Sequence, residues 1–188
     1  MGKERQGKKT NAVREIEGAG VEHRVITFEC PEAISGVEVA GRLGENPERV
    51  FKTLVTQGKS GAHYVFMVPV AEELDLKKAA AAVGEKSVAM VKSKELFPLT
   101  GYVHGGCSPI GMKTKFRTVI DETAELSDRI LFSGGRIGCQ VEMAPEDLKC
   151  LVGAETADVT VGRVFSKDEV MQLESPANAF EEMESQGV

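Results

Sequence analysis

VFKTLVTQGKSGAHYVFMVPV, residues 50–70, sets the architecture of this chain. It holds two runs rich in β-branched and aromatic residues, 50–56 and 63–70, on either side of a segment over 57–61 that contains two glycines. Runs of this composition are typical of β-strands, and a short glycine-containing connection between two of them is typical of a hairpin. The segment is therefore expected to form an antiparallel strand pair.

Helix and strand signals alternate on both sides of this hairpin. We expect helices that begin near Thr10, Ser35, Asp75, Ser93 and Ala144. The fourth helix is expected to end at Phe97, because Pro98 follows. Further short strands are predicted over 24–28, 87–91, 118–121, 129–132 and 138–143. Short strands and helices in no strict βαβ order predict an α+β fold with a mixed sheet that could close on itself.

The composition excludes several classes of protein. With 188 residues, 41% of them hydrophobic, the chain is long and apolar enough to bury a core, so a disordered chain is excluded. No apolar run approaches the ~20 residues of a membrane span, and the polar, basic start does not resemble a secretory signal. A formal charge of −6 argues against a protein that coats nucleic acid through bulk positive charge. We expect a cytoplasmic protein with no membrane or DNA partner.

The charge and the cysteines are distributed unevenly along the chain. Residues 1–10 carry a net charge of +3 and residues 175–188 a net charge of −3. We predict a flexible basic tail over 1–9, a single domain over 10–165 and an acidic tail over 166–188 that can extend a short helix. The cysteines at positions 30, 107, 139 and 150 lack the spacing of metal ligands. Reduced thiols, without a metal or another cofactor, are the expectation.

Lys52 is a charged residue within a strand that otherwise consists mainly of β-branched and aromatic residues. Such a strand is buried on at least one face, and alternation places Lys52 on the same face as Leu54. If Leu54 faces a cavity, Lys52 offers a cation to an anionic or carbonyl-bearing ligand there. A lysine that discourages aggregation at an exposed edge strand is an equally good interpretation. A third interpretation is a lysine that forms a Schiff base with a small carbonyl substrate.

Two glycine-rich segments lie downstream. The loop GYVHGGCSPIG, residues 101–111, can direct successive backbone N–H groups at a carbonyl or an oxyanion, although a plain tight connection is the more common meaning of such a pattern. Lys113, Lys115 and Arg117 follow as a basic strip that is either solvated surface or a phosphate site. The second segment, SGGRIGCQ over 133–140, predicts a hairpin turn. Gln140 either satisfies a core hydrogen bond or lines the same cavity as Lys52.

The order of these segments and their amino-acid sequences resemble those of a known family. The chain is similar to the YbaK/EbsC family of aminoacyl-tRNA deacylases in four stretches: VEVAGRLGENPERVFKTLV, GYVHGGCSPIGMK, ILFSGGRIGCQVEMAPEDL and ADVTV. This family includes the editing domain inserted in bacterial prolyl-tRNA synthetases. The resemblance runs from about Thr10 to Val161. It implies an α+β domain whose mixed sheet is strongly curled, barrel-like and flanked by helices, with a pocket between the lysine strand and the glycine loop.

The resemblance also implies the residues of the site. Lys52 matches the family's essential lysine, and Gly105 with Pro109 matches a Gly-x-x-x-Pro loop whose amides bind the ester carbonyl. Lys52 and Gly105 are therefore the expected catalytic residues. The residues expected to contact the substrate are Thr53, Gly106, Ser108, Pro109, Ser133, Gly134 and Gln140, and those expected at tRNA phosphates are Lys113, Lys115 and Arg117. Some family members carry Asp at the position of Gln140, a change that bears on the choice of amino acid.

The implied activity is the removal of an amino acid esterified to the wrong tRNA. A synthetase cannot strongly reject a slightly smaller or isosteric amino acid, so a second site must remove the error. In the cysteine-editing branch the substrate's own thiol attacks its ester and releases a thiolactone, which fits the lack of a Ser-His-Asp or Cys-His constellation here. Cysteine on tRNA(Pro) is the first expected substrate, and a prolyl-tRNA synthetase is the candidate partner. A non-catalytic module that holds aminoacyl-tRNA or a synthetase is the alternative.

Overall fold

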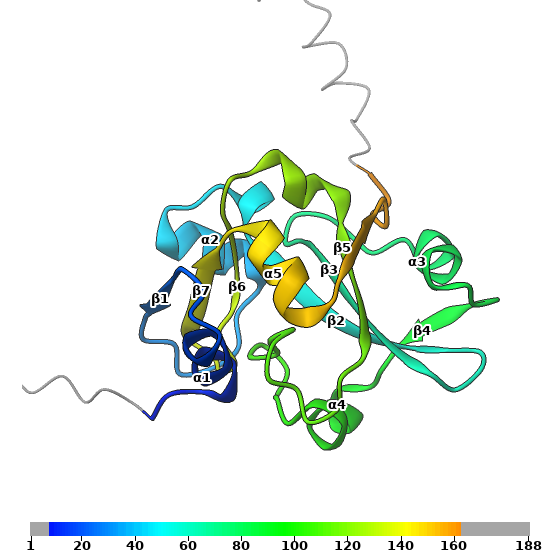
Figure 1. Ribbon diagram of the computed structural model, residues 1–188, viewed down its shortest axis with the longest axis horizontal. Helices are drawn as coiled ribbons and strands as arrows, with labels where there is room; N and C mark the ends of the chain where they lie inside the picture. The colour runs from blue at the N-terminus through cyan, green and yellow to red at the C-terminus, as the bar shows by residue number, and fades with distance from the viewer. Residues whose placement is uncertain (1–7, 163–188) are drawn as a thin grey trace, which may run out of the picture.

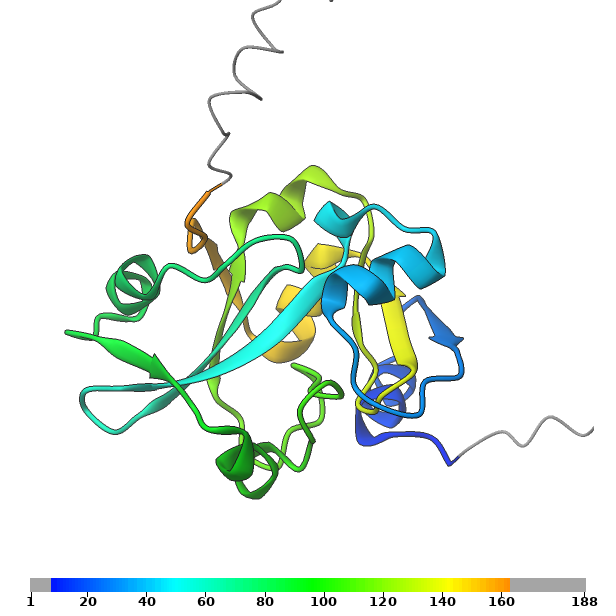
Figure 2. The same cartoon turned by 180° about the vertical axis from the view of Figure 1, so that it is seen from behind.

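The computed structural model describes residues 8–162 of the chain (Figure 1 and Figure 2). The acidic tail predicted over 166–188 lies outside the described residues, as does most of the basic tail predicted over 1–9. The helices and strands, in chain order, are α1 (Asn11–Gly18), β1 (His23–Thr27), α2 (Gly36–Leu43), β2 (Phe51–Gly58), β3 (His63–Pro69), α3 (Leu76–Val83), β4 (Val88–Met90), α4 (Ser93–Thr100), β5 (Arg117–Asp121), β6 (Ile130–Ser133), β7 (Cys139–Met143), α5 (Pro145–Val152) and β8 (Glu155–Ala157). No helix within this part of the chain has the length and apolar character needed to cross a membrane.

The hairpin expected over residues 50–70 is confirmed as β2 and β3. The two strands pair in antiparallel register, with Lys52 opposite Val68 and Thr53 opposite Met67. β5 adds to β3 and β8 adds to β5 in parallel, whereas β4 adds to β2 in antiparallel. The result is a five-stranded mixed sheet in the order β4-β2-β3-β5-β8. Because β4 pairs only with Thr56–Gly58, it leaves the N-terminal half of that edge of β2 largely open.

A second sheet is antiparallel and has the order β1-β7-β6. The α+β class and the mixed sheet predicted from the sequence are thus confirmed. The single sheet curled strongly towards a barrel is wrong, because backbone pairing links the two sheets among the described residues only at an isolated bridge between Val50 and Leu131. β6 is four residues long and meets β2 near its start, so the pairing ends before a barrel can form.

Three of the predicted helix starts are confirmed by their caps. Each cap satisfies backbone N–H groups that have no partner within the helix. The capping groups are the Thr10 hydroxyl at α1, the reciprocal pair of Ser35 and Glu38 at α2, and the Asp75 carboxylate at α3. These short local signals fix where the helices begin.

The end of α4 differs from the prediction. The helix continues through Pro98 to Thr100 instead of stopping at Phe97. Proline removes one helical N–H, but the next carbonyls still find donors. The Thr100 hydroxyl donates to Leu96 O, and the Gly101 N–H donates to Phe97 O, each at 2.8 Å. Gly101 adopts the left-handed conformation that closes a helix.

The main core lies between the two sheets and is closed by α1 and α5, as Figure 1 shows for α5 across their junction. Phe132, Ile120 and Met67 are among its fully buried side chains. α3 covers the opposite face of the five-stranded sheet, and α2 packs near the bridge between the sheets. The open edge of β2 thereby faces α2 on one side and α4 with the loop that follows it on the other.

Candidate functional site

A cavity of about 310 Å³ lies along the open edge of β2. Its walls come from the start of α2, from β2 and β4, from α4, from the glycine loop and from the second sheet. The lining includes Ser35, Val39, Phe51, Lys52, Thr53, Leu54, Val55, Met90, Ser93, Leu96, His104, Gly105, Cys107, Ser133 and Gln140. Its volume is at the lower end of the range for small-molecule sites. A pocket between the lysine strand and the glycine loop, as the resemblance implied, is therefore present.

The backbone of Thr53 is directed at this open edge. The Val70 N–H donates to Val50 O and the Gly58 N–H donates to Ala62 O, each at 2.8 Å. In an antiparallel pair such bonds occur at alternate residues, so the even-numbered residues of β2 bond to β3 and the odd-numbered residues turn their N–H and C=O groups the other way. Pairing on that other side ends where Val91 N–H donates to Val55 O at 3.0 Å. The polar backbone groups of Thr53 therefore border the cavity.

Lys52 supplies the charge of the cavity. It is the only lysine, arginine or carboxylate among the described residues that line it. Its side chain is 26% exposed, and its Nζ lies 3.5 Å from the carboxylate of Glu73, which is itself 83% exposed. An ion pair with so exposed a partner is weakly held. A phosphate or a polarised carbonyl can therefore replace the Glu73 carboxylate.

The Thr53 hydroxyl has an unusual environment. It is buried and lacks a hydrogen-bond partner, the one side-chain polar atom of this kind within residues 8–162. Buried polar groups are nearly always paired, so an exception calls for an explanation such as a bound water or a functional role. Because Thr53 lines the cavity, its unpaired hydroxyl is a candidate partner for a polar group of a ligand.

Gly105 and Gly106 let the loop approach two other segments closely. A Cβ on Gly105 would lie 2.6 Å from the Cβ of Ala33, and the φ of Gly105 is +84°. A Cβ on Gly106 would lie 2.9 Å from the backbone of the β6–β7 turn. The Gly106 N–H is already used in a turn within the loop, at 3.0 Å, whereas the N–H groups of Gly105 and Cys107 donate to no group within residues 8–162. The N–H of His104 likewise donates to no group among these residues, so the amides of His104, Gly105 and Cys107, which all line the cavity, are free to receive an oxyanion.

Cys107 lines the cavity, but its thiol is a poor nucleophile. Burial raises the pKa of its thiol to about 12, although a hydrogen bond with Thr100 opposes the shift. Burial likewise raises the pKa of the neighbouring Tyr102 to about 12, and its hydroxyl donates to Ile110 O at 2.6 Å. A thiol with a raised pKa stays protonated at neutral pH and is a poor nucleophile.

Iodoacetamide at pH 8 is therefore expected to alkylate Cys107 at least about a hundredfold more slowly than Cys150, because only thiolate reacts. Cys150 is exposed, whereas Cys107 is buried. Peptide mapping by mass spectrometry over a time course measures both rates in the same sample, so each cysteine serves as the other's control. Faster alkylation of Cys107 than of Cys150 would contradict the raised pKa.

Ser133 and Gln140 reach the cavity from the second sheet, where they face each other across β6 and β7. Gln140 is 7% exposed. Gly134 does not line the cavity: its N–H donates to the Cys139 carbonyl, and its own carbonyl accepts a hydrogen bond from the Thr10 hydroxyl at 2.6 Å. Gly134 therefore ties the start of α1 to the β6–β7 turn.

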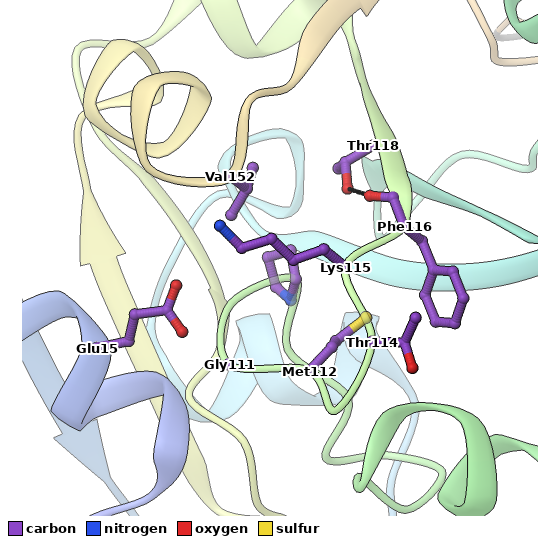
Figure 3. A pocket seen from close by; sticks show the side chains of 9 residues that line it. Glu15, Gly111, Met112, Thr114, Lys115, Phe116, Thr118 and Val152 are labelled. Carbon is purple, nitrogen blue, oxygen red and sulfur yellow. Dashed lines mark hydrogen bonds between the residues drawn. The ribbon is translucent and has the colours of Figure 1, made fainter.

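Ser108 and Pro109 belong to the part of the glycine loop that does not line the cavity. Ser108 is fully buried and accepts a hydrogen bond from Ile110 N at 3.3 Å. Pro109 lines a separate hollow of about 30 Å³, which is too small for an amino acid (Figure 3). Of the residues expected at the substrate, the cavity brings together Lys52, Thr53, Gly105, Ser133 and Gln140, and its lining leaves out Gly106, Ser108, Pro109 and Gly134.

The basic strip expected at tRNA phosphates is divided among three places. Lys115 lines the small hollow and extends towards the gap between α1 and α5 (Figure 3). Arg117 pairs with Glu155 and donates to two carbonyls at the end of α3. The Nζ of Lys113 lies 6.0 Å from the centre of the Phe97 ring on α4. Of the three, only Lys113 therefore has its side chain against an element that walls the cavity, namely α4.

Several residues that line the cavity could not be recognised as site residues from the sequence. Met90 and Leu96 are ordinary apolar residues of short elements, and His104 is a lone histidine in a loop. The one available pointer to His104 is its position next to Gly105. Among the residues that the structure describes, no three His, Cys, Asp or Glu side chains gather as a metal-binding group.

Several known proteins are similar to this chain in sequence or in fold. It is 42% identical over 161 residues to EbsC of Enterococcus faecalis, described as a candidate Cys-tRNA(Pro)/Cys-tRNA(Cys) deacylase, and the match covers 85% of this chain and 98% of that protein. A proline–tRNA ligase of Kosmotoga olearia is 26% identical over 145 residues, and the match covers 77% of this chain and 22% of the ligase. The crystal structure of a candidate trans-editing enzyme for prolyl-tRNA synthetase is 27% identical, with a TM-score of 0.71, and the match covers 82% of this chain and 100% of that one.

The family model named aminoacyl-tRNA editing domain matches residues 30–151. This range includes Lys52, Gly105 and Gln140 and thus the cavity-lining parts of both sheets. The resemblance first drawn from the sequence motifs is confirmed, and the chain belongs to the family of aminoacyl-tRNA editing domains.

Proposed function

We propose that this protein removes misattached amino acids from the 3′ end of tRNA in trans, with cysteine on tRNA(Pro) as its first substrate. The observation that carries the proposal is the single cavity in which Lys52, the unpaired Thr53 hydroxyl and the free loop amides surround a small, largely apolar space. Such a space suits a small amino-acid side chain, with its ester linkage held by the polar groups. The description of EbsC, which names cysteine, tRNA(Pro) and tRNA(Cys), supports this choice.

Each polar group of the cavity has a separate role in binding or catalysis. Lys52 engages the ester carbonyl or the phosphate of the terminal adenosine after it leaves Glu73, since that ion pair is largely exposed. The Gly105 amide and the Cys107 amide receive the negative charge that develops on the carbonyl oxygen during attack on the ester. Ser133, Gln140 and the Thr53 hydroxyl border the amino acid and set which side chain is accepted.

For a cysteinyl ester, the attacking atom is the sulfur of the substrate itself. The sulfur bonds to the ester carbonyl carbon, the bond from that carbon to the tRNA 3′ oxygen breaks, and the thiol proton is transferred to that oxygen. The products are a cyclic thiolactone and a tRNA with a free 3′ hydroxyl, and no water is consumed. This route needs charge stabilisation and positioning from the protein, but no protein nucleophile.

A panel of misacylated tRNAs tests the proposal. Purified protein is incubated with Cys-tRNA(Pro), Ala-tRNA(Pro), Ser-tRNA(Pro) and correctly charged Pro-tRNA(Pro), and the remaining ester is measured over time. We expect the cysteinyl ester to disappear at least about tenfold faster than the seryl ester, because serine carries a hydroxyl, a much weaker nucleophile, in place of the thiol. Recovery of thiolactone by mass spectrometry supports the intramolecular route, whereas free cysteine formed directly indicates attack by water.

The panel also separates an enzyme from a carrier. Turnover of an ester shows catalysis, whereas slower loss of the ester than in buffer alone would show a module that only binds and protects it. Cys107→Ala is the matched internal control, and we expect it to retain activity within about twofold because its thiol is protonated at neutral pH. A hundredfold loss in that variant would instead indicate a protein nucleophile.

We further propose that a prolyl-tRNA synthetase delivers the tRNA in the cytoplasm. The chain has a net charge of −6, and the expected basic strip does not form one continuous face. In the Kosmotoga olearia ligase a related stretch is part of a proline–tRNA ligase chain, which places similar chemistry beside such an enzyme. Addition of prolyl-tRNA synthetase should therefore lower the KM for misacylated tRNA and leave kcat nearly unchanged.

A further inference from the structure

Exposed hydrophobic side chains gather around the cavity. Four of the eight large hydrophobic residues that are exposed within residues 8–162 belong to segments that wall it: Val37, Met90, Phe97 and Val103. Phe97 is the one aromatic residue of this group and is 56% exposed. An exposed aromatic ring at the rim of a ligand cavity is a candidate contact for the part of the ligand that stays outside.

Phe97 stands beside both the cavity and two cations. It lies one helical turn beyond Ser93, which lines the cavity, and residues four apart share a face of a helix. Lys94 is three residues before Phe97 and is its neighbour on the helix surface. Lys113 belongs to the segment that follows the glycine loop. The aliphatic part of its side chain packs against Gly101, where an added Cβ would lie 3.1 Å from Lys113 Cγ. Its Nζ lies 6.0 Å from the centre of the Phe97 ring.

The charge of this region is opposite to that of the whole chain. Residues 92–113, which run from the cap of α4 through the glycine loop to Lys113, carry three lysines and one carboxylate, a net charge of +2 in a chain whose net charge is −6. The one carboxylate, Glu95, accepts a hydrogen bond from the Lys92 N–H at the start of α4, at 3.2 Å. The surface of α4 therefore attracts anions although the protein as a whole repels them.

We propose that Phe97 is a stacking platform for an unpaired base next to the aminoacylated end of the tRNA, with Lys94 and Lys113 at the flanking phosphates. The inference rests on the proposed function, because it assigns the part of the same substrate that remains outside the cavity. An aromatic face with nearby cations is the combination that binds single-stranded nucleic acid without sequence preference. The aminoacyl group enters the cavity beside Ser93, one turn away, while the ring holds a neighbouring nucleotide.

The test measures binding without catalysis. Two RNA minihelices are compared, one with the unpaired 3′ nucleotides of an acceptor stem and one blunt-ended, and neither carries an amino acid. Phe97→Ala is expected to raise the Kd for the minihelix with the overhang by about five- to a hundredfold, the range for loss of one stacked base. The Kd for the blunt minihelix should change less than twofold. Phe97→Trp should bind as wild type does, and Phe97→Leu should bind as Phe97→Ala does, because leucine is apolar but cannot stack.

Two further variants complete the design. Leu126→Ala is the control, because Leu126 is also hydrophobic and is 85% exposed but does not line the cavity; it should not change either Kd. Combined Lys94→Gln and Lys113→Gln should reduce the slope of log Kd against log salt by about 1.4, at about 0.7 for each phosphate contact with a single strand.

Three results would overturn the platform. They are an unchanged Kd in Phe97→Ala, equal binding by Phe97→Leu and Phe97→Trp, and a lower sedimentation mass in Phe97→Ala without an effect on RNA, which would show a contact between two copies of the chain. Failure of the proposed function gives a different pattern. In that case wild-type protein deacylates no member of the tRNA panel, while the minihelix experiment still reports on Phe97.

Discussion

Lys52→Ala is expected to lower kcat/KM for deacylation of the preferred misacylated tRNA by about a hundred- to a thousandfold. Loss of one preorganised donor to a developing oxyanion has this effect in other enzymes. Lys52 has no charged substitute among the described lining residues, and its one ion pair is with the exposed Glu73. The variant should therefore fold normally, with its thermal midpoint close to that of wild type. Initial rates with the panel substrate and a circular-dichroism melting curve measure the two properties.

Lys59→Ala is the matched control for this experiment. Lys59 is an exposed lysine in the turn between β2 and β3, so its loss changes the charge by the same amount without touching the cavity. Lys52→Arg keeps the charge but not the compact ammonium, and an intermediate rate is expected. Full activity of Lys52→Ala on every tRNA of the panel would refute the assignment of the site. A Lys52 adduct trapped by borohydride would favour Schiff-base chemistry instead.

Gly105→Ala is the second substitution with a large expected effect, and we expect it to lower kcat about a hundredfold. The φ of +84° is unfavourable for alanine, and the new Cβ would lie 2.6 Å from the Cβ of Ala33. The loop must therefore move, and its free amides move with it. A displacement of about 1 Å in a catalytic group is enough for a loss of this size. Single-turnover rates measure the effect on the chemical step.

Two variants separate the movement of the loop from the cost of the backbone angle. Gly84→Ala is matched in conformation, because Gly84 has a φ of +75° but nothing within 4 Å of an added Cβ. It should lose some stability and keep its activity. Combining Gly105→Ala with Ala33→Gly removes the atom with which the new Cβ collides, so activity should be partly restored. If the double variant is as slow as Gly105→Ala, the collision with Ala33 is not the cause.

Local features of the fold could be predicted because nearby residues determine them. The Thr10 and Asp75 caps and the hairpin over 50–70 each depend on a few adjacent positions, and each is confirmed. The end of α4 could not be predicted from Pro98 alone, because the decisive hydrogen bond is made by the Thr100 hydroxyl. A proline shows where one donor is lost, but it does not show whether the remaining carbonyls find others.

The arrangement of the sheets depends on contacts far apart in the sequence. Whether the strands close into a barrel is decided by the single bridge between Val50 and Leu131, which no local pattern encodes. The same holds for the site. Ser108 and Gly134 belong to the matched motifs, yet their contacts fix the loop and the start of α1 and do not line the cavity. A sequence motif identifies functionally or structurally important positions, but it does not show whether a given residue contacts the ligand or stabilises the fold.

The open edge of β2 can also be used in the design of a synthetic ligand for this cavity. An unpaired strand edge accepts an extended peptide, which adds to the sheet through main-chain hydrogen bonds and places alternate side chains into pockets. At Thr53 such an edge runs directly along the cavity. A short, rigid strand mimic with one small apolar side chain and an anion directed at Lys52 would combine both features. The cavity thus provides a starting point for inhibitors that contain no nucleotide.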